Sequence, residues 1–376
     1  MEAYLDNAAT TPMHKQAVRV MADALENEYG NPNSLHQVGR RAEDALERAR
    51  KTLAQSIGAA PGEIIFTSGA TEGNNQILRS FIKEGAHIIT SAIEHPSVLR
   101  TLEYAKSQGV RVDFLGVDAL GRIDPLELEA KITKDTVLVS LMMVNNEMGA
   151  IQDLAALAPI IRRKSRRAKF HSDAVQGYLK LPLEVKKADL DFLTVSAHKV
   201  HGPKGCGFVY VRKGQRPASL LLGGEQEQGL RAGTVNVPAI VGFEAAVNAL
   251  APHVEENAAR VKNLKAELLR ELSSLEGIQV NSPLEETSPY ILSIGIPGTR
   301  GEVMLHYLSD KGVYVSTGSA CTSKDTKDSH VLQALKLPEA AIKGSIRISL
   351  TETTTLDEVR HGAAMIKEAV NFLRRK

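Results

Sequence analysis

The sequence predicts an α/β protein with a mostly parallel central sheet flanked by helices, because two kinds of segment alternate along it. From about residue 64 to residue 211, short apolar runs rich in branched residues alternate with longer amphipathic stretches. Such runs are typical of buried strands, and such stretches are typical of the helices that cover them. Parallel strands need crossover helices on both faces of their sheet. With 376 residues, 43% of them apolar, the chain is long enough for two domains and a large core.

The expected elements follow in chain order. Apolar residues at three- and four-residue steps predict a helix over residues 42–57. Strands are expected at residues 63–67, 87–90, 110–114, 136–141, 190–195 and 205–211. Helices are expected between them, for example over residues 97–108 and 154–163.

The pattern changes after Pro252. A long charged helix is expected over residues 254–275, followed by strands at 291–294, 313–315 and 346–349 and a final helix over 356–373. We therefore predict a large domain over residues 13–251. A smaller α+β domain would combine residues 1–12 and 252–376.

Charge and cysteine content exclude several classes of protein. Lys and Arg number 46 against 44 Asp and Glu, so direct nucleic-acid binding is not expected. The basic run at 162–169 is interpreted as a solvated helix end, with docking of tRNA or of an acidic acceptor protein as the alternative. No signal peptide or membrane-spanning run is evident. Only Cys206 and Cys321 occur, which suggests no disulfide framework. We expect a cytoplasmic enzyme, without a membrane span and without a metal site.

A lysine and an aspartate at strand ends carry the functional prediction. Lys199 follows the apolar run at 192–195 and precedes the turn at 202–205, and Asp173 ends an earlier strand. A lysine amine and a buried acid at the mouth of an α/β fold are how proteins hold pyridoxal phosphate (PLP). The amine bonds to the aldehyde, and the carboxylate pairs with the ring nitrogen so that the ring can accept electrons.

A loop of small residues is the candidate site for the cofactor phosphate. Residues 67–71, which include Ala70 and Thr71, follow one expected strand and open a helix, so backbone N–H groups can reach a dianion. Ser196 and His198, beside the lysine, are further donors. An ordinary capped helix start would look the same. The combination with the lysine and the aspartate favours the phosphate site.

Four further residues are candidates for contacts with the ring and the substrate. His95 ends a strand, where an imidazole can stack on the ring and move protons, although a structural histidine is the alternative. Asn146 offers an amide to the ring oxygen or to a substrate carboxylate, and Gln176 is placed to reach the same ring oxygen. Arg347 is the candidate clamp for an α-carboxylate, with a surface arginine as the alternative.

Cys321 suggests which reaction the electron-accepting ring of PLP serves. It lies among small and polar residues that build no core, so we expect an exposed loop. Lys324 nearby would favour the thiolate, which is the form that can accept sulfur, although an incidental free cysteine is the alternative. Cys206 falls in an expected buried strand and is interpreted as inert.

Together these motifs resemble the cysteine desulfurases of the NifS/IscS type, members of the class V aminotransferase group with the fold type I PLP architecture. The resemblance runs through residues 4–12, 67–75, 171–176, 196–205, 231–234 and 319–323. It implies L-cysteine as substrate, alanine as product and a persulfide on Cys321. The acceptor of that sulfur would be an iron–sulfur scaffold or a protein of tRNA or cofactor thiolation. It also implies a homodimer in which Thr234 reaches the phosphate bound by the partner subunit.

The resemblance also implies a role for each remaining candidate. Lys199 would carry the cofactor, Asp173 would hold the ring nitrogen, Gln176 the ring oxygen, His95 would stack, and Asn146 and Arg347 would hold the substrate. Two alternatives stay open. A small-molecule aminotransferase of the same fold has no use for the thiol, and a non-catalytic sulfur-relay docking subunit has no use for the cofactor.

Overall fold

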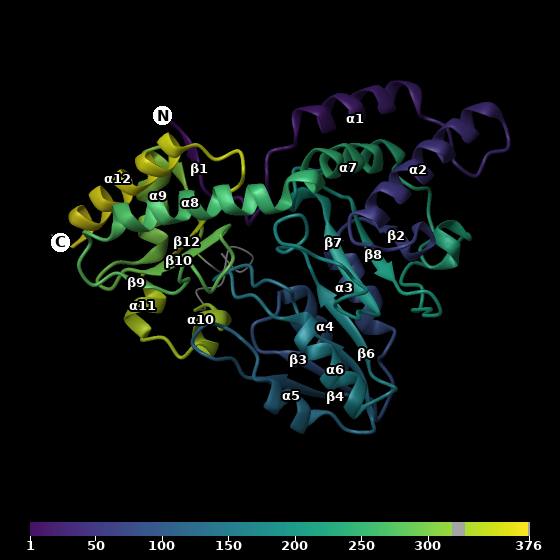
Figure 1. The fold of residues 1–376 in the computed structure, drawn as a ribbon, viewed down its shortest axis with the longest axis horizontal. Helices are drawn as coiled ribbons and strands as arrows, with labels where there is room; N and C mark the ends of the chain where they lie inside the picture. The colour runs from purple at the N-terminus through teal and green to yellow at the C-terminus, as the bar shows by residue number, and fades with distance from the viewer. Residues whose placement is uncertain (318–327, 375–376) are drawn as a thin grey trace.

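The computed structural model describes residues 1–317 and 328–374, and its centre is a seven-stranded sheet (Figure 1). The strand order is β2-β8-β7-β6-β5-β3-β4. Neighbouring strands are parallel except at β8, which runs antiparallel to both β2 and β7. The strands are β2 (Ile64–Thr67), β3 (His87–Ser91), β4 (Arg111–Leu115), β5 (Thr136–Ser140), β6 (Lys169–Asp173), β7 (Phe192–Ser196) and β8 (Gly207–Val211). The predicted mostly parallel sheet is therefore confirmed.

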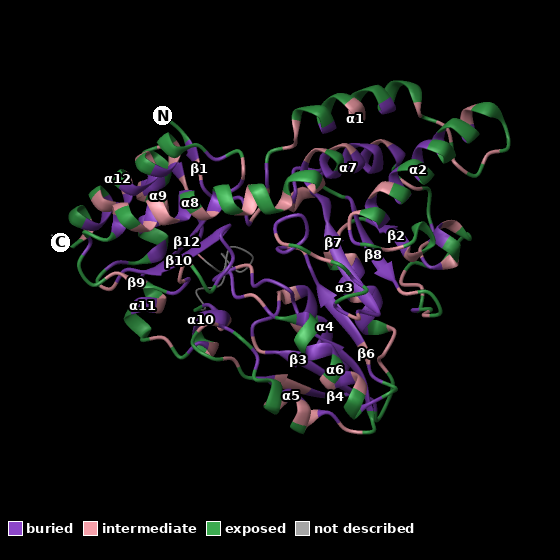
Figure 2. Cartoon of the chain, in the orientation of Figure 1, coloured by how far each residue is buried: buried purple, intermediate pink, exposed green. Residues whose placement is uncertain are grey.

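Helices cover this sheet on both faces, and Figure 2 shows the buried strands between helices whose outer sides are exposed. Every residue of β2, β3, β5, β7 and β8 is buried. Burial on both faces explains why these strands read as continuous apolar runs rather than as alternating patterns. The helices are α2 (Gln37–Gln55), α3 (Ala70–Arg79), α4 (Pro96–Ser107), α5 (Pro125–Lys131), α6 (Leu154–Lys164) and α7 (Val237–Leu250).

The rest of the chain forms a second group of elements beside the large sheet (Figure 1). Its antiparallel sheet has the order β12-β10-β9, and β1 pairs in parallel with β11. The strands are β1 (Ala3–Tyr4), β9 (Gln279–Val280), β10 (Ile291–Gly295), β11 (Val313–Tyr314) and β12 (Ser345–Ser349). The helices are α8 (Val254–Leu272), α9 (Gly301–Asp310), α10 (His330–Ala334), α11 (Glu339–Lys343) and α12 (Leu356–Leu373). The predicted domain boundaries stay a prediction.

The segment after β1 crosses from the small sheets to the large one. Asp6 forms a β-bridge with Ser349 of β12. A few residues later, Thr11 donates hydrogen bonds from its backbone N and its Oγ1 to the carbonyl oxygen of His198, at 2.9 and 3.0 Å. The crossing brings the backbone of residues 8–10 to the carboxyl end of β7, where it becomes one wall of the site described below.

Two helices differ from the sequence-based expectation. The helix α1 (Lys15–Asn27) was not anticipated, because the residues it buries are the small Ala17 and Ala24. The helix α8 ends three residues earlier than expected, since Leu275 is buried and continues the apolar stripe although the helix has already stopped at Ser273.

One described helical stretch, Val237–Leu272, passes a length and hydropathy test for a membrane span, with a mean hydropathy of 1.3. More than half of that window, 56%, is buried inside the protein. Its first part, α7, packs against α1 and α2. The stretch is therefore accounted for as helix of the protein core.

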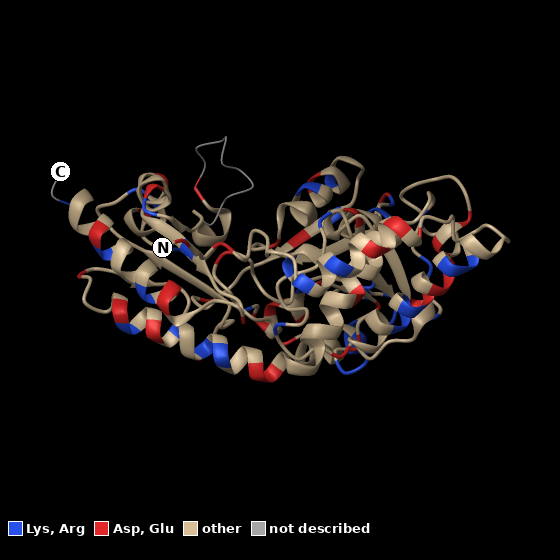
Figure 3. Ribbon diagram, turned by 90° about the horizontal axis from the view of Figure 1, so that it is seen from above, with Lys and Arg blue, Asp and Glu red and all other residues tan. Residues whose placement is uncertain are grey.

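Charges of both signs are interspersed along the outer helices in the view of Figure 3. Within the basic run at residues 162–169, Arg162 is held by Asp189 and Asp191, each at 2.8 Å. Its guanidinium is thus tied into the protein and does not form part of a free basic surface.

Candidate active site

A cavity of about 690 Å³ opens at the carboxyl ends of the parallel strands, where open α/β sheets bind ligands. Residues 8–10 of the crossing segment form one wall, and Arg347 of β12 reaches it from the small sheet. The cavity brings together all the predicted site residues except Thr234 and Cys321, namely Ala70, Thr71, His95, Asn146, Asp173, Gln176, Ser196, His198, Lys199 and Arg347.

Lys199 ends a short 3-10 turn, Ala197–Lys199, that directly follows β7. Its Nζ donates hydrogen bonds to the carbonyl oxygens of Ala8 and Ala9, both at 2.7 Å. The amine is therefore held at the cavity wall by backbone carbonyl oxygens. An amine held in this way is available to bond with an aldehyde once it loses its proton.

Asp173 lies at the end of β6 with an exposed fraction of 5%. Its Oδ2 accepts a hydrogen bond from Asn74 Nδ2 at 2.7 Å, and its Oδ1 accepts one from the backbone N of Val175 at 3.0 Å. Both oxygens are thus oriented by donors. A buried carboxylate that keeps unused acceptor capacity suits a protonated ring nitrogen.

His95 caps the amino end of α4. Its Nδ1 accepts a hydrogen bond from the backbone N of Ser97 at 3.1 Å and lies 2.8 Å from Ser97 Oγ. The proton of a neutral ring therefore sits on Nε2. Burial lowers the pKa of His95; the Asp173 charge opposes this, and Lys199 and His330 lower the pKa further. The imidazole is consequently neutral near pH 7, as a ring that stacks on a cofactor requires.

The candidate phosphate cradle lies where α3 begins. Gly69 takes φ 142°, a left-handed conformation that favours glycine, and within the described chain no side chain caps this helix. The first-turn N–H groups of Ala70 and Thr71 therefore have no intrahelical partner. Ser196 lies alongside, because a Cβ placed on Gly69 would be 3.4 Å from Ser196 Oγ. Burial, reinforced by nearby lysines, lowers the pKa of His198 to about 4, so its ring is neutral.

These residues fit PLP. Backbone N–H groups, a hydroxyl and a neutral imidazole are the donors that a phosphate dianion needs. A lysine and an oriented carboxylate face the same space, where the aldehyde and the ring nitrogen would lie. Among the described residues no group of three or more His, Cys, Asp or Glu side chains is arranged to hold a metal ion.

Gln176 and Arg347 complete the cavity. Gln176 donates from Nε2 to the carbonyl oxygen of Ala8 at 2.9 Å. Arg347 is only 3% exposed, which excludes the alternative of a surface arginine. It donates from Nη1 to the Asn146 carbonyl oxygen at 2.9 Å and from Nη2 to Asp6 Oδ1 at 2.8 Å. Its Nε has no partner among the described residues, which leaves a buried donor for a carboxylate.

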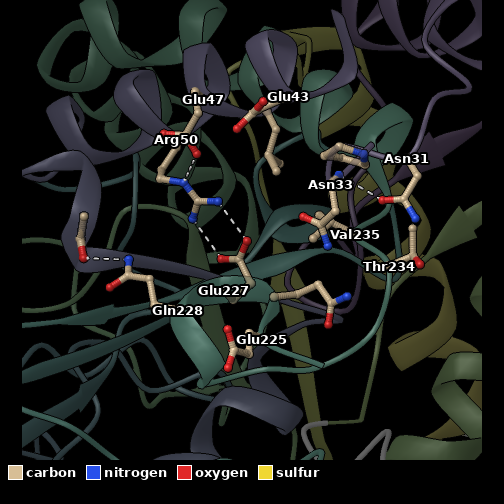
Figure 4. Close-up of a pocket in the computed structure, with 14 residues that line it drawn as sticks. Asn31, Asn33, Glu43, Glu47, Arg50, Glu225, Glu227, Gln228, Thr234 and Val235 are labelled. Carbon is tan, nitrogen blue, oxygen red and sulfur yellow. Dashed lines mark hydrogen bonds and ion pairs between the residues drawn. The ribbon is translucent and has the colours of Figure 1, made fainter. Parts of the chain in front are cut away.

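Two predicted residues lie elsewhere. Cys321 falls outside the described residues. Thr234 lines a second cavity of about 260 Å³, shown in Figure 4, together with Asn31, Arg50 and Glu227. Thr234 therefore does not reach the cavity of its own Lys199.

Several further residues that shape the site were not predicted from the sequence. Glu147 directly follows Asn146, lines the cavity and is buried; burial raises its pKa to about 7, while Ser329 and Arg347 oppose that rise. Asp6 pairs with Arg347, and Asn74 orients Asp173. Asn74 and Asp6 lie inside motifs that carry the resemblance, so their positions in the sequence indicated a role in the site. The sequence did not show which residues they contact.

Comparison with known proteins decides the family. Residues 3–361 match the family model described as aminotransferase class-V. The chain belongs to this family. An IscS cysteine desulfurase of Methanosarcina thermophila is 39% identical over 99% of this chain and 92% of its own length. A cysteine desulfurase of a Nostoc species is 40% identical over 99% of this chain and 93% of its own length.

Solved structures agree with the sequence relatives. A NifS-like protein superposes with a TM-score of 0.93 at 38% identity, covering 99% of this chain and 100% of that one. The predicted fold class, the PLP dependence and the cysteine desulfurase type are thereby confirmed. Neither an aminotransferase nor a sulfur-relay docking subunit is favoured by these relatives.

Proposed function

We propose that the cavity removes sulfur from L-cysteine and passes it to Cys321, which leaves alanine and an enzyme persulfide. The observation that carries this proposal is the convergence of Lys199, Asp173 and Arg347 on one cavity. An amine, a ring-pairing acid and a carboxylate clamp are what a PLP enzyme needs to bind an amino acid and to labilise its α-carbon.

Each residue of the cavity has a proposed role toward the cofactor. Lys199 would hold the aldehyde, Asp173 the ring nitrogen and Gln176 the ring oxygen, while His95 would stack on the ring. The phosphate would be held by Ala70, Thr71, Ser196 and His198. When bound, PLP supplies an electron sink for the bonds of the substrate's α-carbon.

The protein side chains bind the substrate and move its protons. Arg347 and Asn146 would hold the α-carboxylate, because both line the cavity and the guanidinium has a buried donor without a partner among the described residues. Lys199 Nζ, once free, would carry the α-proton. His95 would donate or accept a proton at Nε2, since its Nδ1 is engaged by Ser97.

The sulfur step balances without a further oxidant or reductant. An S–S bond forms between the Cys321 thiolate and the sulfur of L-cysteine while the C–S bond of the substrate breaks. The electron pair of that bond stays on the substrate carbon, which takes up a proton and becomes the methyl group of alanine. The persulfide would then pass to an acceptor protein, an iron–sulfur scaffold or a thiolating enzyme.

Intact mass measurement after incubation with L-cysteine tests this route. The wild type should gain the mass of one or more sulfur atoms on Cys321, and Cys321→Ser should gain none while keeping the absorbance of bound cofactor. Cys206→Ala is the matched control, because burial raises the pKa of the Cys206 thiol to about 12 and keeps it protonated. Continued release of alanine by Cys321→Ser would refute the assigned role.

We further propose a cytoplasmic homodimer in which Thr234 binds the phosphate of the partner subunit. The position of Thr234 at a second cavity, apart from its own Lys199, supports this proposal. Lys199→Ala and Thr234→Ala chains should complement each other when co-expressed, since the mixed dimer would hold one intact site. Absence of complementation at limiting PLP would argue for action within one chain.

A further inference from the structure

Lys180 is a buried lysine next to the cavity. It has no role in the mechanism proposed above. Its exposed fraction is 5%, and lysines are rarely buried unless a partner holds them. After β6 the chain makes helical turns, in which the backbone N of Tyr178 donates to the carbonyl oxygen of Ala174 at 2.8 Å. The i to i+4 spacing places Lys180 directly beside Gln176.

The hydrogen bonds around Gln176 fix the direction of its amide. Lys180 Nζ donates to Gln176 Oε1 at 2.9 Å, and Gln176 Nε2 donates to the carbonyl oxygen of Ala8 at 2.9 Å. An ammonium group can only donate, and a carbonyl oxygen can only accept. With one partner of each kind, the amide oxygen must face Lys180. The amide nitrogen must face the cavity wall, where one N–H remains for a ligand.

We propose that Lys180 is a positioning residue that, together with the carbonyl oxygen of Ala8, fixes which end of the Gln176 amide faces the cofactor. The proposal rests on the proposed contact between Gln176 and the ring oxygen of PLP. That oxygen is an acceptor, so a flipped amide would set two oxygens against each other and lose a donor. Lys180 itself lies behind Gln176 and does not line the cavity.

The charge of Lys180 acts in the same direction as its hydrogen bond. Burial lowers the pKa of Lys180 to about 7; Lys199 and Arg347 lower it further, and Glu352 opposes them. The ring centroid of Tyr290 lies 5.7 Å from its Nζ. Because electrostatic coupling is reciprocal, Lys180 disfavours a second positive charge on the cofactor-bound amine wherever Lys180 is itself protonated. Loss of Lys180 should therefore make that amine easier to protonate.

Absorbance titration of the bound cofactor, without L-cysteine, tests the proposal. In Lys180→Met the pH midpoint of the absorbance change should rise, and PLP should bind about three- to tenfold more weakly, as expected for one lost hydrogen bond. Lys180→Gln should show the same shifts, because an amide at position 180 can donate or accept and leaves only the Ala8 carbonyl oxygen to select the direction of the Gln176 amide. Lys180→Arg, a donor only, should restore both readouts.

Lys265 offers a matched control. It is also a fully buried lysine, held by Thr287 Oγ1 at 2.8 Å and the Ser288 carbonyl oxygen at 3.0 Å, and burial lowers its pKa to about 7. It does not line the cavity. Lys265→Met should lower stability and leave the midpoint and the PLP affinity unchanged. Equal shifts in both methionine variants would overturn the proposal.

A double mutant separates action through Gln176 from direct action. In a Gln176→Ala background, Lys180→Met should weaken PLP binding no further, and a fully additive loss would overturn the proposal. If Lys180→Met does not fold, Lys180→Gln provides the same comparison in both backgrounds. If this test fails, the proposed sulfur transfer to Cys321 can still hold. If no persulfide forms on Cys321, the result for Lys180 can still hold, because it is measured without L-cysteine.

Discussion

Asn74 connects the acid and the imidazole of the site through its two amide hydrogens. One goes to Asp173 Oδ2 at 2.7 Å and the other to Ser97 Oγ at 2.9 Å. The Ser97 hydroxyl is in turn 2.8 Å from Nδ1 of His95. A single buried amide on α3 thus orients the groups proposed for the ring nitrogen and for the ring face, and both depend on its remaining a donor.

Asn74→Asp keeps the shape of the side chain and reverses its hydrogen-bonding role. A second carboxyl group would face Asp173, and the two would have to share a proton, which weakens the pairing of Asp173 with the ring nitrogen. We expect PLP affinity to fall about ten- to a hundredfold, as for a hydrogen bond to a charged group. Equilibrium dialysis of PLP measures this. Asn27→Asp on the exposed face of α1 is the control and should bind PLP normally; normal binding by Asn74→Asp would contradict the role.

Individual site residues were predictable where they follow expected strands. Lys199, Asp173 and His95 meet because the carboxyl ends of parallel strands share one edge of the sheet. The ion pair of Asp6 and Arg347 was not predictable, since 341 positions separate the two residues. The sequence contains many other acidic and basic residues with which either could pair. The position of Lys180 behind Gln176 depends on a helical turn after β6. No repeat of apolar residues in the sequence predicts that turn.

At the scale of elements, the segment before Thr234 is held in an unfavourable conformation. Glu227 and Gln228 have φ values of 48° and 60°, each costing about 1–2 kcal/mol for a residue with a Cβ. The Glu227 carboxylate compensates by accepting hydrogen bonds from both Nη groups of Arg50 at 2.8 Å (Figure 4). It also accepts one from the backbone N of Phe66 at 2.8 Å. This ion pair is buried at both ends.

Arg50→Met should lower the free energy of unfolding by about 3–5 kcal/mol, because it leaves the Glu227 carboxylate buried without its cation. Urea unfolding measures the loss. Adding Glu227→Gln should recover part of it, since the amide oxygen can still accept from Phe66 and no charge stays buried. If the double variant were less stable than Arg50→Met, the unpaired charge would not be the cause.

Strands and helices with a strong repeat of apolar residues were predictable from the sequence. The direction in which each strand runs in its sheet was not. Thr355 caps α12 and a regular apolar stripe follows it, so the predicted helix over 356–373 matches the observed one. The antiparallel course of β8 could not be read, because an apolar run that is buried on both faces looks the same in either direction. The helix α1 was not predicted, because its buried residues are alanines, which are too small to give a clear apolar face in the sequence.

Folding of the protein encloses an acidic side chain, Glu94, next to His95 of the cavity. Glu94, in the turn between β3 and α4, accepts from Ser91 Oγ at 2.6 Å and from the backbone N of Met142 at 2.9 Å, both on Oε1. Its Oε2 has no partner among the described residues. Burial raises the pKa of Glu94 to about 8; the two hydrogen bonds oppose this, and the Asp173 charge adds to it. Folding therefore requires a proton that the unfolded chain does not hold at neutral pH.

The stability of the protein should consequently depend on pH through Glu94. Between its ordinary pKa of 4.5 and about 8, the native state binds the proton and the unfolded state does not. The contribution of this proton is complete below that window and is lost as pH rises through it, at about 1.4 kcal/mol per unit. Glu94→Gln removes the titration and keeps an acceptor at Oε1. The free energy of unfolding of the variant, relative to wild type, should therefore increase from about pH 5 to about pH 8.

Urea unfolding at several pH values across that window measures the difference. Glu103→Gln, on the exposed side of α4, is the matched control, because the Glu103 side chain stays 57% exposed in the folded protein, where it forms an ion pair with the likewise exposed Arg100. Its free energy relative to wild type should stay constant with pH. A constant difference for Glu94→Gln as well would mean that Glu94 is ionised in the native protein. The acid would then need a cation that the described contacts of its Oε1 do not include.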